Sequence, residues 1–293
     1  MDYKTDIKRS FPDWIRFKIP DTETTKQIQF FLGNMEISTV CKSALCPNRP
    51  ECWSHKTATF LLLGNVCSRR CSFCAVKKGQ PGAPDTAEKN KILKAVEYMG
   101  LQYIILTMVT RDDLPDGGAK HISEVITSLK ENFPDRKVEV LVSDFEGNIA
   151  SLKTILETKP DVFAHNLETV ERLCPIVRDK KCSYHISLDV LKKVKELYPE
   201  IKTKSGIMVG LGETKDEIFQ TLKDLENVGC SIVTIGQYLQ PTAKQLPVSH
   251  FLSPEEFHFF EQWAENNLTL KVIAGPEVRS SYHADYWCKE RKG

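Results

Sequence analysis

The chain has 293 residues, of which 41% are hydrophobic and 27% are charged, so it can bury the core of one or two domains. Its 40 basic and 39 acidic residues give a formal net charge of +1, which argues against nucleic acid or a membrane surface as its partner. No apolar run approaches the roughly 20 residues that span a bilayer, and the first 20 residues lack the apolar stretch of a secretory signal. We therefore expect a cytoplasmic protein whose ten cysteines are reduced thiols.

The first part of the chain, residues 1–57, shows no alternation of strands and helices. It carries a cysteine triplet with the spacing Cys41-x4-Cys46-x5-Cys52. Taken alone, this triplet is compatible with a structural zinc site or with an iron–sulfur cluster, because cysteine thiolates bind both. We expect these residues to form an extension laid on the main domain.

From about residue 58 onward, apolar β-rich runs alternate with helical patterns. The expected strands cover residues 59–63, 103–109, 138–142, 162–166, 205–209, 232–238 and 270–274. The expected helices cover residues 86–99, 118–132, 149–157, 168–173, 216–228 and 254–266. This alternation predicts an α/β fold with a parallel sheet, closed into a full or partial barrel over residues 58–276 and followed by a C-terminal segment, 277–293. Functional residues then belong at the carboxyl ends of the strands.

A second triplet, Cys67-x3-Cys71-x2-Cys74, directly follows the first expected strand. A structural zinc site needs four ligands, and the nearest histidine, His55, lies on the other side of that strand. Three thiolates in one compact loop instead favour an iron–sulfur cluster with one iron left open.

The Cys67 loop, with the aromatic Phe73 before its last cysteine, resembles the cluster motif of the radical S-adenosylmethionine superfamily. The two triplets in this order, together with Arg279-Ser280-Ser281-Tyr282, resemble the lipoyl synthase family in particular. Other similar segments are residues 111–119, 165–169, 204–214 and 236–241, so the resemblance spans roughly residues 30–285.

This resemblance implies a partial (β/α)6-type radical S-adenosylmethionine TIM barrel that holds two [4Fe–4S] clusters. Cys67, Cys71 and Cys74 would hold the cluster whose fourth iron binds S-adenosyl-L-methionine, the source of a 5′-deoxyadenosyl radical. Residues expected to contact the cosubstrate are Phe73, Asn166, Glu168 and Arg178. No catalytic side chain is expected beyond the cluster ligands.

By the same resemblance, Cys41, Cys46 and Cys52 would hold an auxiliary cluster whose fourth ligand is a serine. Adjacent side chains of an extended segment point to opposite faces, so only one of the two serines should bind iron. We favour Ser281 from its position in the motif, with Ser280 as the alternative.

The implied activity is that of a sulfurtransferase, a lipoyl synthase that replaces hydrogens on carbon atoms 6 and 8 of a protein-bound octanoyl-lysine by sulfur. The partners would be octanoylated lipoyl carrier domains, such as 2-oxoacid dehydrogenase E2 subunits and the glycine cleavage H protein. An electron donor such as flavodoxin or ferredoxin is also implied. Two alternatives remain, a radical enzyme of another type and a non-catalytic zinc-binding protein.

The remaining cysteines have no metal-ligand spacing, and we expect them to be small buried hydrophobic residues: Cys174, Cys182, Cys230 and Cys288. The run Gly210-Leu211-Gly212-Glu213-Thr214-Lys215 is not a dinucleotide-binding motif, because Lys215 stands where the third glycine is required.

Overall fold

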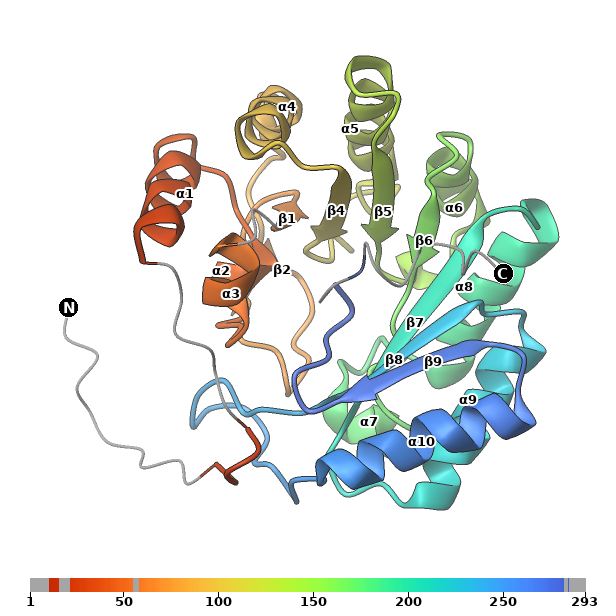
Figure 1. Ribbon diagram of the computed structural model, residues 1–293. Coiled ribbons are helices and arrows are strands. Elements are labelled where there is room, and N and C mark those ends of the chain that lie inside the picture. Colours follow the sequence, from red (N-terminus) through yellow and green to blue (C-terminus); the bar gives the residue numbers. More distant parts are fainter. Residues whose placement is uncertain (1–10, 16–21, 55–57, 282–283, 285–293) are drawn as a thin grey trace.

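The computed structural model describes residues 11–15, 22–54, 58–281 and 284 (Figure 1). Tyr282 of the serine motif and Cys288 therefore lie outside the described residues. Among the described helices, none combines the length and the apolar character needed to cross a bilayer.

Seven parallel strands form the main sheet, and their order in the sheet follows their order in the chain. They are β1 (Thr59–Leu62), β4 (Tyr103–Met108), β5 (Lys137–Leu141), β6 (Val162–Ala164), β7 (Lys202–Val209), β8 (Ile232–Gln237) and β9 (Lys271–Gly275). The sheet curves into an arc (Figure 1). The arc is open because β1 and β9 are the two edges of the sheet. The prediction of a partial parallel barrel is confirmed.

Helices cover the outer face of this arc (Figure 1). They are α4 (Glu88–Met99), α5 (Ala119–Asn132), α6 (Ile149–Leu156), α8 (Tyr184–Leu197), α9 (Lys215–Asn227) and α10 (Pro254–Asn267). The last two begin where the sequence supplies capping boxes: Thr214 with Glu217 at α9, and Ser253 with Glu256 at α10. Each of these helices buries one apolar stripe, and the helical periodicity predicted all of them except α8.

Among the barrel helices, the structure differs from the sequence prediction in two places. The expected helix over 168–173 is wrong, because the backbone of Glu168 pairs with Gly206 and Met208 of β7 and its φ is +68°. Helical structure begins later, with the turn η2 (Glu171–Leu173) and the short helix α7 (Cys174–Val177). The prediction also missed α8, a helix capped by Ser183, whose side chain accepts from the Ile186 amide.

A buried ion pair crosses the interior of the arc. Lys204 Nζ of β7 lies 2.9 Å from Glu139 Oε1 of β5, and both side chains are 1% exposed. The Tyr103 hydroxyl of β4 donates to Glu139 Oε2 at 2.6 Å. A buried charge is tolerated only when it is paired and hydrogen-bonded, and these three strands supply both conditions.

The two ends of the described chain meet at this arc. The extension contains α1 (Thr22–Asn34), α2 (Val40–Ser43) and α3 (Arg49–Ser54), and Thr39 forms an antiparallel bridge with Phe60 of β1. The segment after β9 turns back inside the arc (Figure 1), where Asn48 Nδ2 donates to the Glu277 carbonyl at 2.6 Å. Extension and C-terminal segment are thus joined 229 residues apart in sequence.

Candidate active site

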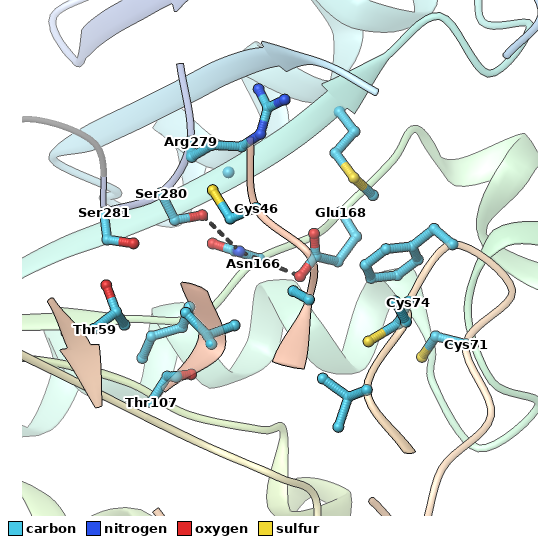
Figure 2. Close-up of a pocket in the computed structure, with 18 of the residues that line it drawn as sticks. Cys46, Thr59, Cys71, Cys74, Thr107, Asn166, Glu168, Arg279, Ser280 and Ser281 are labelled. Atoms are coloured by element: carbon cyan, nitrogen blue, oxygen red, sulfur yellow. Dashed lines mark hydrogen bonds between the residues drawn. The ribbon is translucent and has the colours of Figure 1, made fainter. Parts of the chain in front are cut away.

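A pocket of about 560 Å³ lies at the carboxyl ends of the strands, where a parallel barrel is expected to place its site. Its wall contains all six cysteines of the two triplets and both serines of the C-terminal segment. In Figure 2, Cys71 and Cys74 lie on one side, Cys46 and the serines on the other, and Asn166 and Glu168 between them. Groups separated by more than 200 residues are therefore gathered around one cavity.

Hydrogen bonds fix the Cys67 loop from several directions. Cys67 ends β2 (Val66–Cys67), which pairs with β3 (Lys77–Lys78), and its carbonyl accepts from the Gly79 amide at 3.0 Å. Lys78 Nζ donates to the Cys71 carbonyl at 2.7 Å, and the Ser72 amide donates to Val177 at 2.9 Å. A loop held at both ends and in its middle presents its three thiols in a fixed arrangement.

Arg69, inside the same loop, points into the protein and is 4% exposed. Its guanidinium lies 2.6 Å from Asp144 and 3.0 Å from Asp112, which follow β5 and β4. Burial opposes the charge, but the hydrogen bonds with Asp144 and Asp112 prevail and raise the pKa of Arg69. The sequence analysis missed this clamp, although its arginine stands between two cluster cysteines and both carboxylates follow expected strands.

The first triplet is carried by the short helices of the extension. Cys41 lies in α2, Cys52 in α3, and the Cys46 amide donates to the Cys41 carbonyl at 3.1 Å. Burial, with the nearby Cys46 as a second cause, raises the pKa of Cys41 to about 11. Burial, and then the neighbouring Cys41 and Cys46, also raise the pKa of Cys52. A metal centre bound here must therefore displace protons, as thiolate sites generally do.

Two glycines let the C-terminal segment approach strands β7 and β8 closely. A Cβ on Gly236 of β8 would lie 2.1 Å from the Val278 carbonyl oxygen, and one on Gly206 of β7 would lie 3.0 Å from Ser280 Oγ. The premise of an extended serine segment is wrong, because residues 280 and 281 lie in a turn. Both serines line the pocket, so alternation of faces does not distinguish them.

The wall between the triplets carries unused hydrogen-bonding atoms. Asn166 Nδ2 donates to Ser280 Oγ at 2.8 Å and to Glu168 Oε1 at 3.2 Å (Figure 2), while its Oδ1 is buried without a partner. His165 Nδ1 contacts the Val142 carbonyl at 2.8 Å, and its Nε2 is likewise buried without a partner. Since a carbonyl only accepts, Nδ1 carries the proton and Nε2 is an acceptor.

Charges around this wall are consistent with a polar ligand. Burial, and then the nearby Arg178, lowers the pKa of His165 to about 4, so the ring is neutral at pH 7. Burial raises the pKa of Glu168, although Arg178 and Asn166 act in the opposite direction and lower it. Arg178 is 7% exposed and donates to Ser187 Oγ at 2.7 Å. The unpartnered acceptors of Asn166 and His165, together with the Glu168 carboxylate, fit the hydroxyl groups of a ribose. The buried Arg178 guanidinium fits a carboxylate. The residues present therefore fit S-adenosylmethionine.

The other predicted positions divide into two groups. Phe73 lines the pocket, as expected for a residue of the cluster loop. Cys174 and Cys230 are buried, as predicted. The prediction for Cys182 is wrong: it is only partly buried and lines the pocket, where Arg69 Nη1 donates to its Sγ at 3.3 Å. The neighbouring Cys71 thiol, and then Arg178 and Arg69, lower the pKa of Cys182 against burial. Sequence spacing could not reveal this position, because α7 and its flanking loop bring Cys182 to the site.

The cysteines surround the pocket instead of converging on a point. Within the described ranges, no three of the His, Cys, Asp and Glu side chains form a group that could hold a single metal ion. A [4Fe–4S] cluster binds each thiolate through a different iron, so its ligands surround the cluster.

An open βα arc with a three-cysteine loop at the carboxyl end of its first strand is the architecture of radical S-adenosylmethionine enzymes. The Radical SAM superfamily model matches residues 61–225, so the chain belongs to that superfamily. Solved structures agree on the fold. HydG, the FeFe-hydrogenase maturase from Carboxydothermus hydrogenoformans, is similar with a TM-score of 0.56 at 15% identity, over 90% of this chain and 75% of that one. Streptococcus suis SuiB gives a TM-score of 0.58 at 10% identity, over 78% and 52%.

Within the superfamily, the chain belongs to the lipoyl synthase family. It is 49% identical to the lipoyl synthase of Caldanaerobacter subterraneus subsp. tengcongensis, covering 94% of this chain and 95% of that protein. It is 44% identical to the lipoyl synthase of Thermus thermophilus, over 95% and 87%, and 47% identical to that of Chlamydia trachomatis serovar L2, over 96% and 90%.

Proposed function

We propose that this chain inserts two sulfur atoms into a protein-bound octanoyl-lysine, at carbon atoms 6 and 8, to give lipoyl-lysine. The single observation that carries the proposal is that both cysteine triplets and both serines line one pocket. The family membership supports the same activity. Unactivated methylene groups have no acidic proton, so acid–base catalysis does not reach them and a carbon-centred radical is needed.

Two sets of residues would hold the two [4Fe–4S] clusters. Cys67, Cys71 and Cys74 would hold the radical cluster, and the extension's triplet, Cys41, Cys46 and Cys52, would hold the auxiliary one. When bound, the clusters and S-adenosylmethionine supply the one-electron chemistry and the sulfur. The protein itself contributes binding, orientation and exclusion of water.

The chain's own residues would position the cosubstrate at the wall between the triplets. Asn166, Glu168 and the neutral His165 would accept hydrogen bonds from ribose hydroxyls, and Arg178 would pair with the methionine carboxylate. Phe73 would provide an apolar surface beside the last cluster cysteine.

We propose Ser281 as the fourth protein ligand of the auxiliary cluster, with Ser280 as the alternative. An oxygen ligand is harder than a thiolate and less suited to iron in a sulfide cluster, which fits a cluster that must give up its sulfur. The hydroxyl of Ser280 already accepts a hydrogen bond from Asn166 Nδ2 at 2.8 Å, which favours Ser281 as the ligand.

We further propose a division of the chain into an extension (1–57), a barrel (58–276) and a serine-bearing segment (277–293). The substrates are octanoylated lipoyl domains, and we propose 2-oxoacid dehydrogenase E2 subunits and the glycine cleavage H protein as their carriers. Flavodoxin or ferredoxin would supply electrons. A cytoplasmic location is proposed because reduced thiols persist there.

The test is an anaerobic incubation of the reconstituted protein with a chemical reductant, S-adenosylmethionine and an octanoylated carrier peptide. We expect about 8 Fe per chain and a peptide that has gained two sulfur atoms, detected by mass spectrometry. Zinc without iron, or an unmodified peptide despite cosubstrate cleavage, would reject the proposal.

Matched variants assign the two triplets. Cys71→Ala should abolish cleavage of S-adenosylmethionine, whereas Cys46→Ala should retain cleavage and lose sulfur insertion. Ser281→Ala and Ser280→Ala are compared in the same assay. If only Ser280→Ala abolishes product, the assignment of Ser281 is wrong.

A further inference from the structure

Ser280 joins the C-terminal segment to the pocket wall between the two cysteine triplets. Its hydroxyl oxygen accepts a hydrogen bond from Asn166 Nδ2 at 2.8 Å, across 114 residues of sequence (Figure 2). Gly206 leaves room for this contact, since a Cβ placed there would lie 3.0 Å from Ser280 Oγ and 3.1 Å from Asn166 Oδ1. The segment that carries both serines is therefore bonded directly to a side chain of the proposed cosubstrate site.

The two hydrogen bonds of Asn166 fix the orientation of its side-chain amide. An amide nitrogen has two N–H groups, and Asn166 Nδ2 donates to Ser280 Oγ and, at 3.2 Å, to Glu168 Oε1. Both donors are then used, and the oxygen Oδ1 is buried without a partner among the described residues. Asn166 therefore lacks only a donor to its oxygen, and a ribose hydroxyl would be such a donor.

The Ser280 hydroxyl supplies one of the two contacts that hold this orientation. Without it, the amide is held by Glu168 alone, and the terminal torsion of an asparagine side chain has a broad range of accessible angles. A ligand that needs the amide oxygen in one place must then restrict this rotation as it binds. Ordering a side chain upon binding lowers affinity, so the hydroxyl of Ser280 preorganises Asn166.

We propose that Ser280 positions Asn166 for S-adenosylmethionine, so that the cosubstrate binds more tightly when the serine segment is docked in the pocket. By linkage, the cosubstrate must stabilise the docked segment by the same factor. Cosubstrate binding is thereby coupled to the placement of Ser281, the proposed fourth ligand of the auxiliary cluster. This role of Ser280 rests on the proposed function, because it presupposes that this wall binds S-adenosylmethionine.

The first test measures cosubstrate affinity on the protein reconstituted with both clusters and kept without a reductant, so that S-adenosylmethionine is bound and not cleaved. Ser280→Ala should raise the Kd of S-adenosylmethionine by roughly 2- to 10-fold, as expected for the loss of one hydrogen bond. In an Asn166→Ala background, the same substitution should leave the Kd unchanged, because the partner is already absent. Ser123→Ala is the matched control, since this hydroxyl donates within α5 to the Lys120 carbonyl at 2.8 Å.

The reciprocal effect is measured on the parent chain without any substitution. Trypsin cleaves after arginine, and Arg279 directly precedes Ser280. Arg279 Nη1 donates to the Val278 carbonyl at 2.6 Å and to the Pro276 carbonyl at 3.3 Å, so tryptic cleavage there requires the segment to open. Saturating S-adenosylmethionine should slow this cleavage by the same roughly 2- to 10-fold factor, and it should have no such effect in Ser280→Ala. The fragment that ends at Arg279 is quantified by mass spectrometry.

Four results would overturn the proposal. They are an equal Kd for the parent and Ser280→Ala, an undiminished effect of Ser280→Ala in the Asn166→Ala background, and cleavage after Arg279 that the cosubstrate does not slow. The fourth is a loss of about 4 Fe in Ser280→Ala alone, since Ser280 would then be a cluster ligand. A parent protein that binds neither iron nor S-adenosylmethionine would instead refute the proposed function, so the two failures are distinguishable.

Discussion

The close passage of the C-terminal segment over Gly236 predicts the outcome of a single added methyl group. In Gly236→Ala, the new Cβ would lie 2.1 Å from the Val278 carbonyl oxygen. An ordinary contact begins near 3.4 Å, so the carbonyl must retreat by 3.4 − 2.1, or about 1.3 Å. Overpacking of this kind costs about 1–3 kcal/mol, which corresponds to roughly 5- to 150-fold in the equilibrium of the docked segment.

The retreat would move the segment off β8 and displace Ser280 and Ser281 from their present positions in the pocket wall. A misplacement of about 1 Å can cost roughly a hundredfold in rate, and we expect a loss of that order in sulfur insertion. Cleavage of S-adenosylmethionine should persist, because the Cys67 loop is anchored by other contacts. Both products are quantified in one anaerobic reaction by mass spectrometry.

Gly33→Ala is the matched control, because no atom lies within 4 Å of the added Cβ in α1. This variant should insert sulfur at the parent rate. If Gly236→Ala also inserts sulfur at the parent rate, the close passage does not position the serines and the reasoning is refuted. Loss of both activities together would indicate general misfolding and would equally contradict the expected uncoupling.

Two further predictions concern buried charge. Lys204→Met leaves Glu139 buried without its partner and should lower the free energy of unfolding in urea by about 3–5 kcal/mol. The double variant Lys204→Met/Glu139→Gln should recover most of that loss, and an equal loss in both variants would contradict the prediction. Burial lowers the pKa of His165 to about 4 in the folded chain, whereas a histidine in the unfolded chain has its ordinary pKa of about 6.5. Between those pH values only the unfolded chain therefore binds this proton. The stability should therefore fall by roughly 3 kcal/mol as pH drops from 6.5 to 4, and His165→Phe should flatten that part of the urea-midpoint profile; an unchanged slope would refute it.

Much of the fold followed from the sequence because its strands are short apolar runs that are easily separated from amphipathic helices. The prediction failed where long-range contacts override local pattern. Glu168 has a helix-compatible side chain, but its backbone is hydrogen-bonded to Gly206 and Met208 of β7 and adopts a positive φ instead of a helical conformation. Local patterns do not contain information on a strand that lies nearly 40 residues further along the chain.

The residues of the candidate site were likewise predicted only in part. The spacing within one short loop indicated a cluster site for the second triplet, whereas the first triplet was assigned to a cluster only through the resemblance to the lipoyl synthase family. The contribution of Arg69 depends on Asp112 and Asp144, which follow β4 and β5 and reach Arg69 only when the strand ends meet. Cys182 reaches the pocket through the loop between α7 and α8. The serine segment was found through its motif, but its turn and the glycines beneath it required the structure.

The joining of Asn48 to Glu277 also sets an order of events during synthesis. Residues emerge from the ribosome N-terminus first, at about 5–20 per second, so 229 residues require on the order of ten to fifty seconds. Throughout that interval the first triplet has been synthesised, but the C-terminal segment that completes the pocket wall has not. A chain whose translation stops between residues 75 and 279 would contain all six triplet cysteines and still lack both serines. Completion of this pocket therefore shows that translation has passed the serine segment.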